Sequence, residues 1–481
     1  MSGNSFDIPN IILIIPRGEA VRNFLYSDTL AVLSAHARVT LLSIIDDARF
    51  LARFRPAAEK IVPLVSFHEH RALAYLRGVI QEAHFRWMWS KVAQNHWETK
   101  DARAVRPGER LKWTALKAAA RLAANSPSLT ALTRLENFLT WAMRPDDAYR
   151  RVFEAVKPDI VFNTSQIHGP AGDLPVKIAH RCGIPTACFI FSWDNPTSRS
   201  RITAPYDYFF VWNRHMCGQI LSLYPQVHRS QVFVTGTPQF DFHFKPEFWL
   251  ERRDLCRRIG ADPDRPFILY TTGMDRDFPE EHRTVEYIAR ILHTIDVSPR
   301  PQLIVRTYVK GTSPQMNALA GRRLPGVIFP PQLWDEKWLY TPRYEDLAVY
   351  TSLLRECSAG INAASTVSLE LMMHDKPVIN LAFNPPGSTL PHHLRWRRHI
   401  EYDHYRPVAE SGAVDVARFP EDLPGMIRRS ILHPEAGREQ REQFVRRMFA
   451  DTLDGKSGIR VAQKLISVAG SAHGSSRHDD T

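Results

Sequence analysis

Short apolar runs alternate with stretches of helical periodicity along most of the chain, and this alternation predicts two successive α/β halves. Strands buried on both faces of a parallel sheet appear as continuous runs of Val, Ile, Leu and Phe. Runs of this kind in the first half predict strands at 11–15, 37–45, 60–64, 159–163, 186–191, 208–212 and 231–235. In the second half they predict strands at 266–271, 302–306, 327–330 and 378–383. Strands that alternate with helices are typical of doubly wound sheets.

The stretch between residues 68 and 147 interrupts this alternation. It lacks a strand pattern and is rich in Ala, Leu, Arg, Trp and Phe, which predicts a helical insertion. A chain of 481 residues also exceeds one ordinary hydrophobic core. We therefore expect an N-terminal α/β domain at 1–245 that carries the insertion, a C-terminal α/β domain at 246–469, and a disordered tail at 470–481.

The stretch from Gly360 to Phe383 predicts a tight turn, a short helix and a buried strand. Ser365 is a natural N-cap, and Ser365 and Thr366 place hydroxyls where free N–H groups and the helix dipole favour an anion. Glu370 lies one turn after Thr366 on the same face, level with a ribose attached to a bound phosphate. The alternative is an ordinary capped helix with one solvated glutamate.

Composition and charge narrow the classes of partner. The chain is 44% hydrophobic and 23% charged, as in soluble globular proteins, and its net charge of +11 indicates an anionic partner. Nucleic acid ranks last, because no long Lys/Arg block, zinc finger or RNP motif is present. The five scattered cysteines favour reduced thiols in a cytoplasmic protein. No signal peptide precedes the first strand, and no apolar run approaches the ~20 residues of a spanning helix.

The insertion offers a second place for an anionic partner. Four of its tryptophans are interleaved with Arg and Lys, and they are Trp87, Trp89, Trp97 and Trp113. Aromatic and basic residues that share helices suit the interface of an anionic membrane. The alternative, which we slightly favour, is a packed helical hairpin with a solvated basic face.

Two common nucleotide motifs are missing from the sequence. Neither GxGxxG nor GxxxxGK[ST] follows the first strand or occurs elsewhere. A dinucleotide-dependent dehydrogenase and a P-loop kinase are therefore unexpected.

Four segments together resemble a known fold family. In order they are SWDNPTS, YDYFFVWN, VFVTGTPQFD and INAASTVSLELMMHDKPVINLAF. Their order is similar to that in bacterial surface-carbohydrate enzymes of the GT-B glycosyltransferase superfamily, which includes UDP-sugar 2-epimerases and CDP-glycerol glycerophosphotransferases. The resemblance covers about 155–245 and 265–385. It implies two Rossmann-like doubly wound domains that face each other across a cleft.

The resemblance also implies a nucleotide-diphosphate donor held by the C-terminal domain. Ser365 and Thr366 would then meet the diphosphate, and Glu370 the ribose. Gly273, after the strand at 266–271, would let the backbone approach the phosphates, and Arg306 would pair with them. The family often has a basic residue with a histidine at the latter position, and the segment RTYVKG here lacks the histidine.

GT-B enzymes generally need no metal or other cofactor, so none is expected. Two D-x-D pairs, Asp262 with Asp264 and Asp275 with Asp277, are interpreted as a turn and a solvated loop. A basic cluster from His392 to His399 could hold an anionic substrate or form a solvated face, and a metal site is improbable there.

We expect the N-terminal domain to bind the acceptor substrate. An inverting transfer needs a base that takes the acceptor's proton. Three residues on loops after strands are candidates, namely Glu19, His168 and Asp194, and the sequence does not choose among them. Asp194 could equally form a turn, and His168 could be structural.

These observations favour a cytoplasmic glycosyltransferase, peripheral to the inner membrane face, that moves a sugar from a nucleotide-sugar to a cell-surface polysaccharide or lipid-linked acceptor. A polyol-phosphate transferase of the CDP-glycerol type and a non-catalytic GT-B-fold binding protein are the alternatives. A UDP-sugar 2-epimerase is disfavoured, because that family is shorter and lacks such an insertion.

Overall fold

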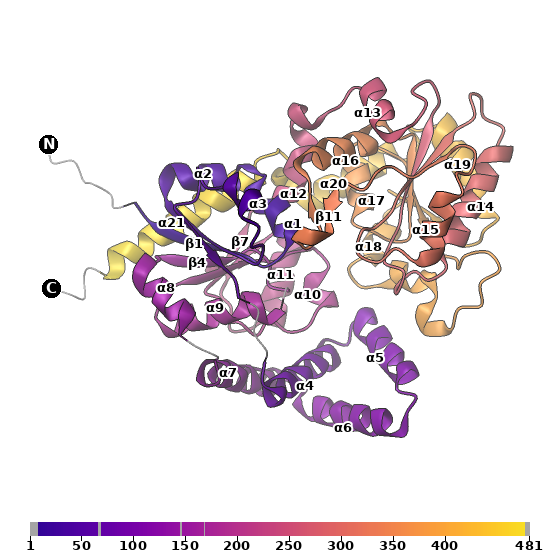
Figure 1. Ribbon diagram of the computed structural model, residues 1–481. Helices are drawn as coiled ribbons and strands as arrows, with labels where there is room; N and C mark the ends of the chain where they lie inside the picture. The colour runs from indigo at the N-terminus through magenta and orange to yellow at the C-terminus, as the bar shows by residue number, and fades with distance from the viewer. Residues whose placement is uncertain (1–7, 66–68, 145–146, 168, 477–481) are drawn as a thin grey trace. The chain divides into compact units, whose positions relative to one another are not determined.

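A computed structural model describes residues 8–65, 69–144, 147–167 and 169–476 (Figure 1). The chain divides into two compact units. The first comprises Met1–Phe244, Asp335–Thr341 and Asp451–Thr481, and the second comprises Lys245–Trp334 and Pro342–Ala450. The sequence-based division at residues 245 and 469 therefore differs in two places, because the segments 335–341 and 451–481 pack with the first unit.

A seven-stranded parallel sheet forms the centre of the first unit, in the order β3-β2-β1-β4-β5-β6-β7. Its strands are β1 (Asn10–Ile15), β2 (Arg38–Ser43), β3 (Lys60–Pro63), β4 (Ile160–Asn163), β5 (Thr186–Phe189), β6 (Tyr208–Val211) and β7 (Val232–Val234). All seven were predicted from the apolar runs. Phe24 packs edge-to-face on Phe162 and Phe189 over this sheet. The buried aromatic contacts explain why the strands are apolar on both faces.

Short helices follow most of these strands. They are α1 (Gly18–Ala20), α2 (Asp28–His36), α3 (Ala48–Ala52), α8 (Ala148–Val156), α9 (Gly169–Arg181), α10 (Asn195–Ser198), α11 (Arg214–Leu223), α12 (Pro238–Asp241) and α21 (Ser457–Ser476). Helix α21 packs along α2, and α8 packs against α9 (Figure 1).

The C-terminal helix α21 corrects the expected start of a disordered tail at residue 470. Residues 470–476 continue this helix instead of starting a disordered tail, and residues 477–481 lie outside the described part of the chain. The carboxylate of Asp241 caps the helix, since it accepts the N–H groups of Ser457 at 2.9 Å and Gly458 at 2.7 Å. Asp241 is the last residue of VFVTGTPQFD, one of the four segments that carry the resemblance. This residue of the segment therefore stabilises the fold.

Four helices form the predicted insertion, namely α4 (Arg71–Met88), α5 (Lys91–Arg103), α6 (Pro107–Ala123) and α7 (Ser126–Ala142). They enclose a small core of their own, in which Trp97 and Trp113 are buried and Trp87 and Trp89 are partly buried. The four tryptophans therefore pack inside the insertion, as the interpretation of a packed helical unit expects. Since they are occupied there, they do not supply an aromatic membrane surface.

A buried ion pair fastens the insertion to the rest of the first unit. Lys177 of α9 lies 2.6 Å from both carboxylate oxygens of Glu136 of α7, and both side chains are buried. Arg77 of α4 also contacts Glu136 at 2.6 Å. A buried carboxylate needs such partners, because an uncompensated charge in the interior is strongly unfavourable.

The second unit contains a six-stranded parallel sheet in the order β10-β9-β8-β13-β14-β15. Its strands are β8 (Phe267–Thr271), β9 (Gln302–Arg306), β10 (Val327–Ile328), β13 (Ala359–Asn362), β14 (Val378–Leu381) and β15 (Asp415–Ala417). The sequence interpretation was wrong at β13, which was taken as part of a turn, and it missed β15. Both are short, and β13 owes its strand conformation to pairing with β8 and β14 on its two sides.

The helices of the second unit surround this sheet. They are α13 (Arg252–Ile259), α14 (Glu281–Thr294), α15 (Pro314–Gly321), α16 (Tyr344–Glu356), α17 (Val367–Met373), α18 (Arg406–Ala409), α19 (Asp422–Leu432) and α20 (Arg438–Phe449). Two very short strands, β11 (Trp334–Asp335) and β12 (Thr341–Pro342), stand apart from the main sheets. Within the described ranges, no helix is both long enough and apolar enough to cross a bilayer.

Candidate active site

The strand order of the second sheet reverses between β8 and β13. From β8 the chain adds β9 and β10 on one side, and then returns to place β13, β14 and β15 on the other side. In open α/β sheets, ligands bind at the carboxyl ends of the strands beside such a reversal. Gly273 follows β8, Arg306 ends β9, and Ser365 and Thr366 follow β13. The topology therefore brings these predicted residues to the carboxyl ends of three adjacent strands.

A buried polar network fixes the loop between β13 and α17. The side-chain oxygen of Asn362 accepts the N–H of Ser365 at 3.0 Å, the hydroxyl of Ser368 at 3.1 Å and the amide of Asn380 at 3.1 Å. The Tyr405 hydroxyl lies 2.7 Å from the Ser368 hydroxyl. Because four buried side chains hold one another, the loop that carries Ser365 is rigidly positioned.

Ser365 and Thr366 are half-buried at the start of α17. The Ser365 hydroxyl accepts the N–H of Val367 at 3.3 Å, so it caps the helix as predicted. Thr366 occupies the formal cap position without a side-chain capping bond. The capped-helix alternative thus describes Ser365 correctly, but its solvated glutamate is wrong, because Glu370 is buried.

Glu370 is buried one turn further along α17. Its carboxylate accepts a short hydrogen bond from the hydroxyl of Tyr350 on α16. The guanidinium of Arg306 lies 5.0 Å above the ring of the same tyrosine. Tyr350 therefore links the two residues that the resemblance assigned to ribose and diphosphate.

Arg306 already has a protein partner. One terminal nitrogen of its guanidinium lies 2.7 Å and 2.9 Å from the two carboxylate oxygens of Asp346. The indole N–H of Trp334 donates to the same carboxylate at 2.8 Å. A bound diphosphate would share this guanidinium with Asp346, and the pair holds the arginine in one orientation.

Nearby residues fill the space around Gly273 and bind its N–H group. A Cβ at this position would lie 2.1 Å from the ring of Phe278, so no larger residue fits without a shift. Its N–H donates to both carboxylate oxygens of Glu281 at 3.2 Å, and Tyr270 donates its hydroxyl to Glu281 at 2.8 Å. Burial raises the pKa of Glu281 to about 8. The N–H of Gly273 thus serves an internal carboxyl group.

The first unit has a strand-order reversal of its own, between β1 and β4. Glu19 lies in α1, directly after β1, and is buried with its carboxylate 3.7 Å from Arg17. His168, in the loop after β4, lies outside the described residues. Asp194 follows β5, the strand next to β4, and its carboxylate accepts the hydroxyl of Ser198 at 2.5 Å. By position, Glu19 lies beside the reversal, and Asp194 lies one strand away.

The sequence interpretation missed several residues of this region. Asp346 and Tyr350 lie four residues apart on α16, a helix that was predicted without any chemistry. Their spacing, which puts both on one helix face, was the available signal. Asn362 ends β13 and Asn380 lies within the neighbouring strand β14, and each is a buried polar side chain, which is also unusual within an apolar run.

The acidic pairs and the basic cluster have structural partners. Asp262 accepts the N–H of Asp264 at 3.0 Å, which confirms the predicted turn. The carbonyl oxygen of Asp277 accepts a hydrogen bond from Arg398 at 3.1 Å, and the ring of His399 packs at a tilt against that of Phe278. In the described part of the chain, no group of three or more His, Cys, Asp or Glu side chains is arranged to hold a metal ion.

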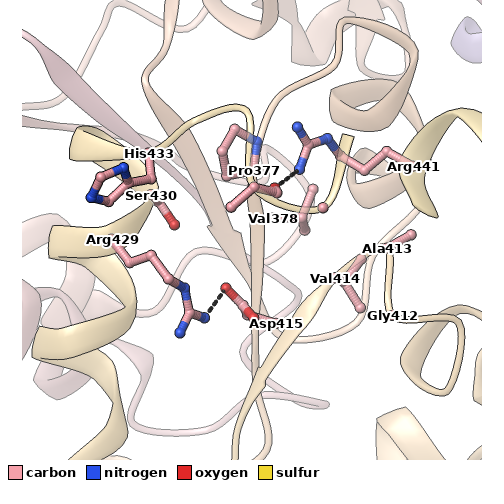
Figure 2. A pocket seen from close by; sticks show the side chains of 12 residues that line it. Pro377, Val378, Gly412, Ala413, Val414, Asp415, Arg429, Ser430, His433 and Arg441 are labelled. Carbon is pink, nitrogen blue, oxygen red and sulfur yellow. Dashed lines mark hydrogen bonds and ion pairs between the residues drawn. The ribbon is translucent and has the colours of Figure 1, made fainter. Parts of the chain in front are cut away.

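A separate hollow of about 330 Å³ lies at the amino ends of β14 and β15, the edge of the sheet opposite to the candidate site (Figure 2). Its arginines are occupied. Arg429 pairs with Asp415 at 2.7 Å, and Arg441 donates to Asp375 and to two carbonyl groups. We therefore assign this hollow a structural role.

Comparison with known proteins supports the fold. Neither a family model nor a curated protein sequence matches the chain. Among solved structures, a putative UDP-N-acetylglucosamine 2-epimerase from Listeria monocytogenes is similar, with a TM-score of 0.54, 12% identity, and coverage of 95% of this chain and 96% of that one. The 2-epimerase from Neisseria meningitidis bound to UDP-GlcNAc gives a TM-score of 0.52 at 11% identity, with 95% and 100% covered. A further UDP-N-acetylglucosamine 2-epimerase gives 0.52 at 13% identity, with 95% of each chain covered.

At such low identities, the likeness shows the fold alone. Together with the two parallel sheets, it confirms the predicted GT-B fold class of two Rossmann-like domains.

Proposed function

We propose that this chain is an enzyme of nucleotide-sugar chemistry that holds a nucleotide diphosphate at the carboxyl edge of its second sheet. The observation that carries the proposal is the strand-order reversal between β8 and β13, beside which Arg306, Ser365 and Glu370 are gathered. The similar solved structures include one with UDP-GlcNAc bound, which supports a nucleotide-sugar as the ligand class.

The roles of these residues follow from their chemistry. The N–H groups and hydroxyls at the start of α17, from Ser365 and Thr366, would bind the diphosphate. Arg306, oriented by Asp346, would supply positive charge to the leaving diphosphate. Glu370, oriented by Tyr350, would accept the ribose hydroxyls. This arrangement of charges would stabilise a leaving nucleotide without a metal ion.

The reaction that we propose is glycosyl transfer to a cell-surface polysaccharide or a lipid-linked acceptor, in the cytoplasm. The base would be Glu19, His168 or Asp194, on the loops that follow β1, β4 and β5. A polyol-phosphate transferase of the CDP-glycerol type would use the same donor side.

A UDP-sugar 2-epimerase is the second candidate, because the three similar structures described above are enzymes of that name. It changes the configuration of the sugar and needs no acceptor, whereas a transferase releases the free nucleotide only when an acceptor is present.

Calorimetric titration with UDP, CDP and GDP tests the nucleotide site. We expect one of them to bind, and Glu370→Ala to weaken that binding by about tenfold, since a hydrogen bond to a charged group contributes about 1.5–3 kcal/mol. Glu439→Ala, which removes an exposed glutamate of the same unit, is the matched control. If no nucleotide binds, the non-catalytic alternative is favoured; if Glu370→Ala binds as tightly as the parent, the ribose assignment is wrong.

Incubation with UDP-GlcNAc, with and without a lipid-linked sugar acceptor, separates the two reactions. Release of UDP only in the presence of acceptor indicates transfer, and a changed sugar without acceptor indicates epimerisation. Repeating the assay with EDTA tests independence from metal ions, because a metal-dependent enzyme would lose its activity.

A further inference from the structure

The most exposed apolar side chains gather on one helix of the insertion. Among the large apolar residues of the described chain, the three with the greatest exposed fraction are Leu122 at 83%, Leu111 at 72% and Val105 at 68%. The first two lie on α6, and Val105 lies just before it. Single exposed leucines are common on protein surfaces, but this concentration on one segment is not.

The exposed residues of α6 form a continuous stripe. Leu111, Ala115, Ala118 and Leu122 are all exposed and follow the spacing i, i+4, i+7 and i+11. Residues at this spacing lie along one face of a helix. The opposite face of α6 buries Trp113 and Ala120 against the core of the insertion. Helix α6 is therefore apolar on its inner face, as folding requires, and also along a narrow outer stripe.

Basic side chains border this stripe. Consecutive residues on a helix are about 100° apart, so Arg110 and Lys112 flank Leu111 on its two sides. Lys117 and Arg121 lie on the same side of the stripe as Arg110, where each rests 5.4 Å above a tryptophan ring, Trp113 and Trp97 respectively. Glu109, at the start of the helix, is the only acidic residue of α6.

The charge of the whole insertion has the same sign. Residues 71–142 contain twelve Lys and Arg against five Asp and Glu, and so carry seven of the chain's net +11 charges. A second copy of this chain would bring two such surfaces together, which like-charge repulsion disfavours. An anionic surface complements them.

The shape of the patch favours a bilayer over a protein. Leu111 and Leu122 stand out from the helix with most of their surface exposed, so no other part of the described chain covers them. A bilayer surface accepts a helix lying flat, with its apolar stripe at the acyl boundary and its lysines and arginines among the headgroups.

We propose that the outer face of α6 docks on the surface of an anionic bilayer through Leu111 and Leu122, with Arg110 and Lys112 at the headgroups. This surface differs from the tryptophans that the sequence pointed to, because those side chains fill the core of the insertion. The proposal does not depend on nucleotide binding.

Flotation of the full chain with vesicles of phosphatidylglycerol and phosphatidylethanolamine tests this surface. We expect the protein to float with these vesicles and not with phosphatidylcholine alone. Leu111→Gln/Leu122→Gln should lower the bound fraction by about tenfold or more, since both substitutions remove apolar surface that the bilayer would bury. Lys112→Glu and added salt should lower it as well.

The matched control is Phe419→Gln/Leu432→Gln, which removes two exposed apolar side chains from the second unit and should bind like the parent. Circular dichroism and thermal unfolding verify that each variant is folded. Failure of the parent to float, or flotation unchanged by the α6 substitutions, would overturn the proposal. If the α6 variants instead change the sedimenting mass or the capture of an acidic protein, the face is a protein interface and the bilayer assignment is wrong.

Discussion

At the scale of single residues, a group that the sequence predicts to bind a ligand can instead form a hydrogen bond within the protein. Gly273 was expected to admit a phosphate, yet its N–H donates to the buried Glu281 and its missing Cβ makes room for Phe278. Sequence reasoning found the position because it follows a strand. It had no means to find Glu281 as the partner, since that contact depends on how α14 folds back onto β8.

The pKa of Glu281 leads to a prediction of stability against pH. The folded protein holds the proton of this carboxyl up to about pH 8, whereas the ordinary pKa is 4.5. The folded state therefore binds more protons than the unfolded state between these values, and this contribution to stability is lost as the pH rises through 8. We expect the free energy of unfolding of Glu281→Gln, measured with urea, to rise relative to that of the parent when the pH is raised from 5 to 9. The same difference between variant and parent at pH 5 and at pH 9 would contradict this prediction. Glu439→Gln, at an exposed glutamate, is the control.

The buried pair of Lys177 and Glu136 gives a second prediction at this scale. Lys177→Met leaves the buried Glu136 with Arg77 as its remaining cation, which should lower the free energy of unfolding by about 3 kcal/mol, the low end of the range for a broken buried ion pair. The double variant Glu136→Gln/Lys177→Met should be less destabilised than the single one, because the side chain that lost its lysine is then neutral. Chemical denaturation measures both. Arg150→Met, which breaks an exposed pair with Glu154, should change stability by less than about 1 kcal/mol.

At the scale of elements, the apolar runs predicted the seven strands of the first sheet because most of those strands are buried, and only the edge strand β3 has no buried residue. The method failed at two short strands of the second sheet, β13 and β15. Gly360 to Asn362 in β13 has one β-branched residue, and its strand conformation comes from two neighbouring strands. The tail was mispredicted for a related reason: residues 470–476 have a weak helical composition and extend a helix whose apolar face is held elsewhere.

The cap of α21 tests how firmly this helix is attached to the first unit. Asp241→Ala removes the acceptor of two N–H groups at the start of a helix, which should cost about 1–2 kcal/mol. Hydrogen exchange should then show faster exchange along α21 and little change in the sheet of the second unit. Asp254→Ala, at the exposed start of α13, is the control, and unchanged exchange in α21 would refute the capping role.

At the scale of the whole molecule, the two units share one topological feature. In each sheet the strand order reverses once, between β1 and β4 or between β8 and β13, and the predicted site residues follow strands at or beside the reversal. The apolar runs indicated which residues follow which strands, so the candidates could be placed at the carboxyl edge of each sheet. Strand order is a property of the folded sheet, and for this reason the sequence did not rank Glu19 above Asp194.

The division of residues between units predicts that binding and turnover are separable. The proposed nucleotide residues, such as Glu370, all belong to the second unit, and Glu19 and Asp194 belong to the first. Glu19→Gln should therefore leave the nucleotide dissociation constant unchanged and lower kcat by about 10²-fold or more, as loss of a general base does. Asp194→Asn should have the smaller effect, because its carboxylate is held by Ser198 in a turn.

Full turnover by Glu19→Gln, measured with the substrate identified by the UDP-GlcNAc assay, would exclude Glu19 as the base. A loss of nucleotide affinity in the same variant would contradict the separation of the two functions.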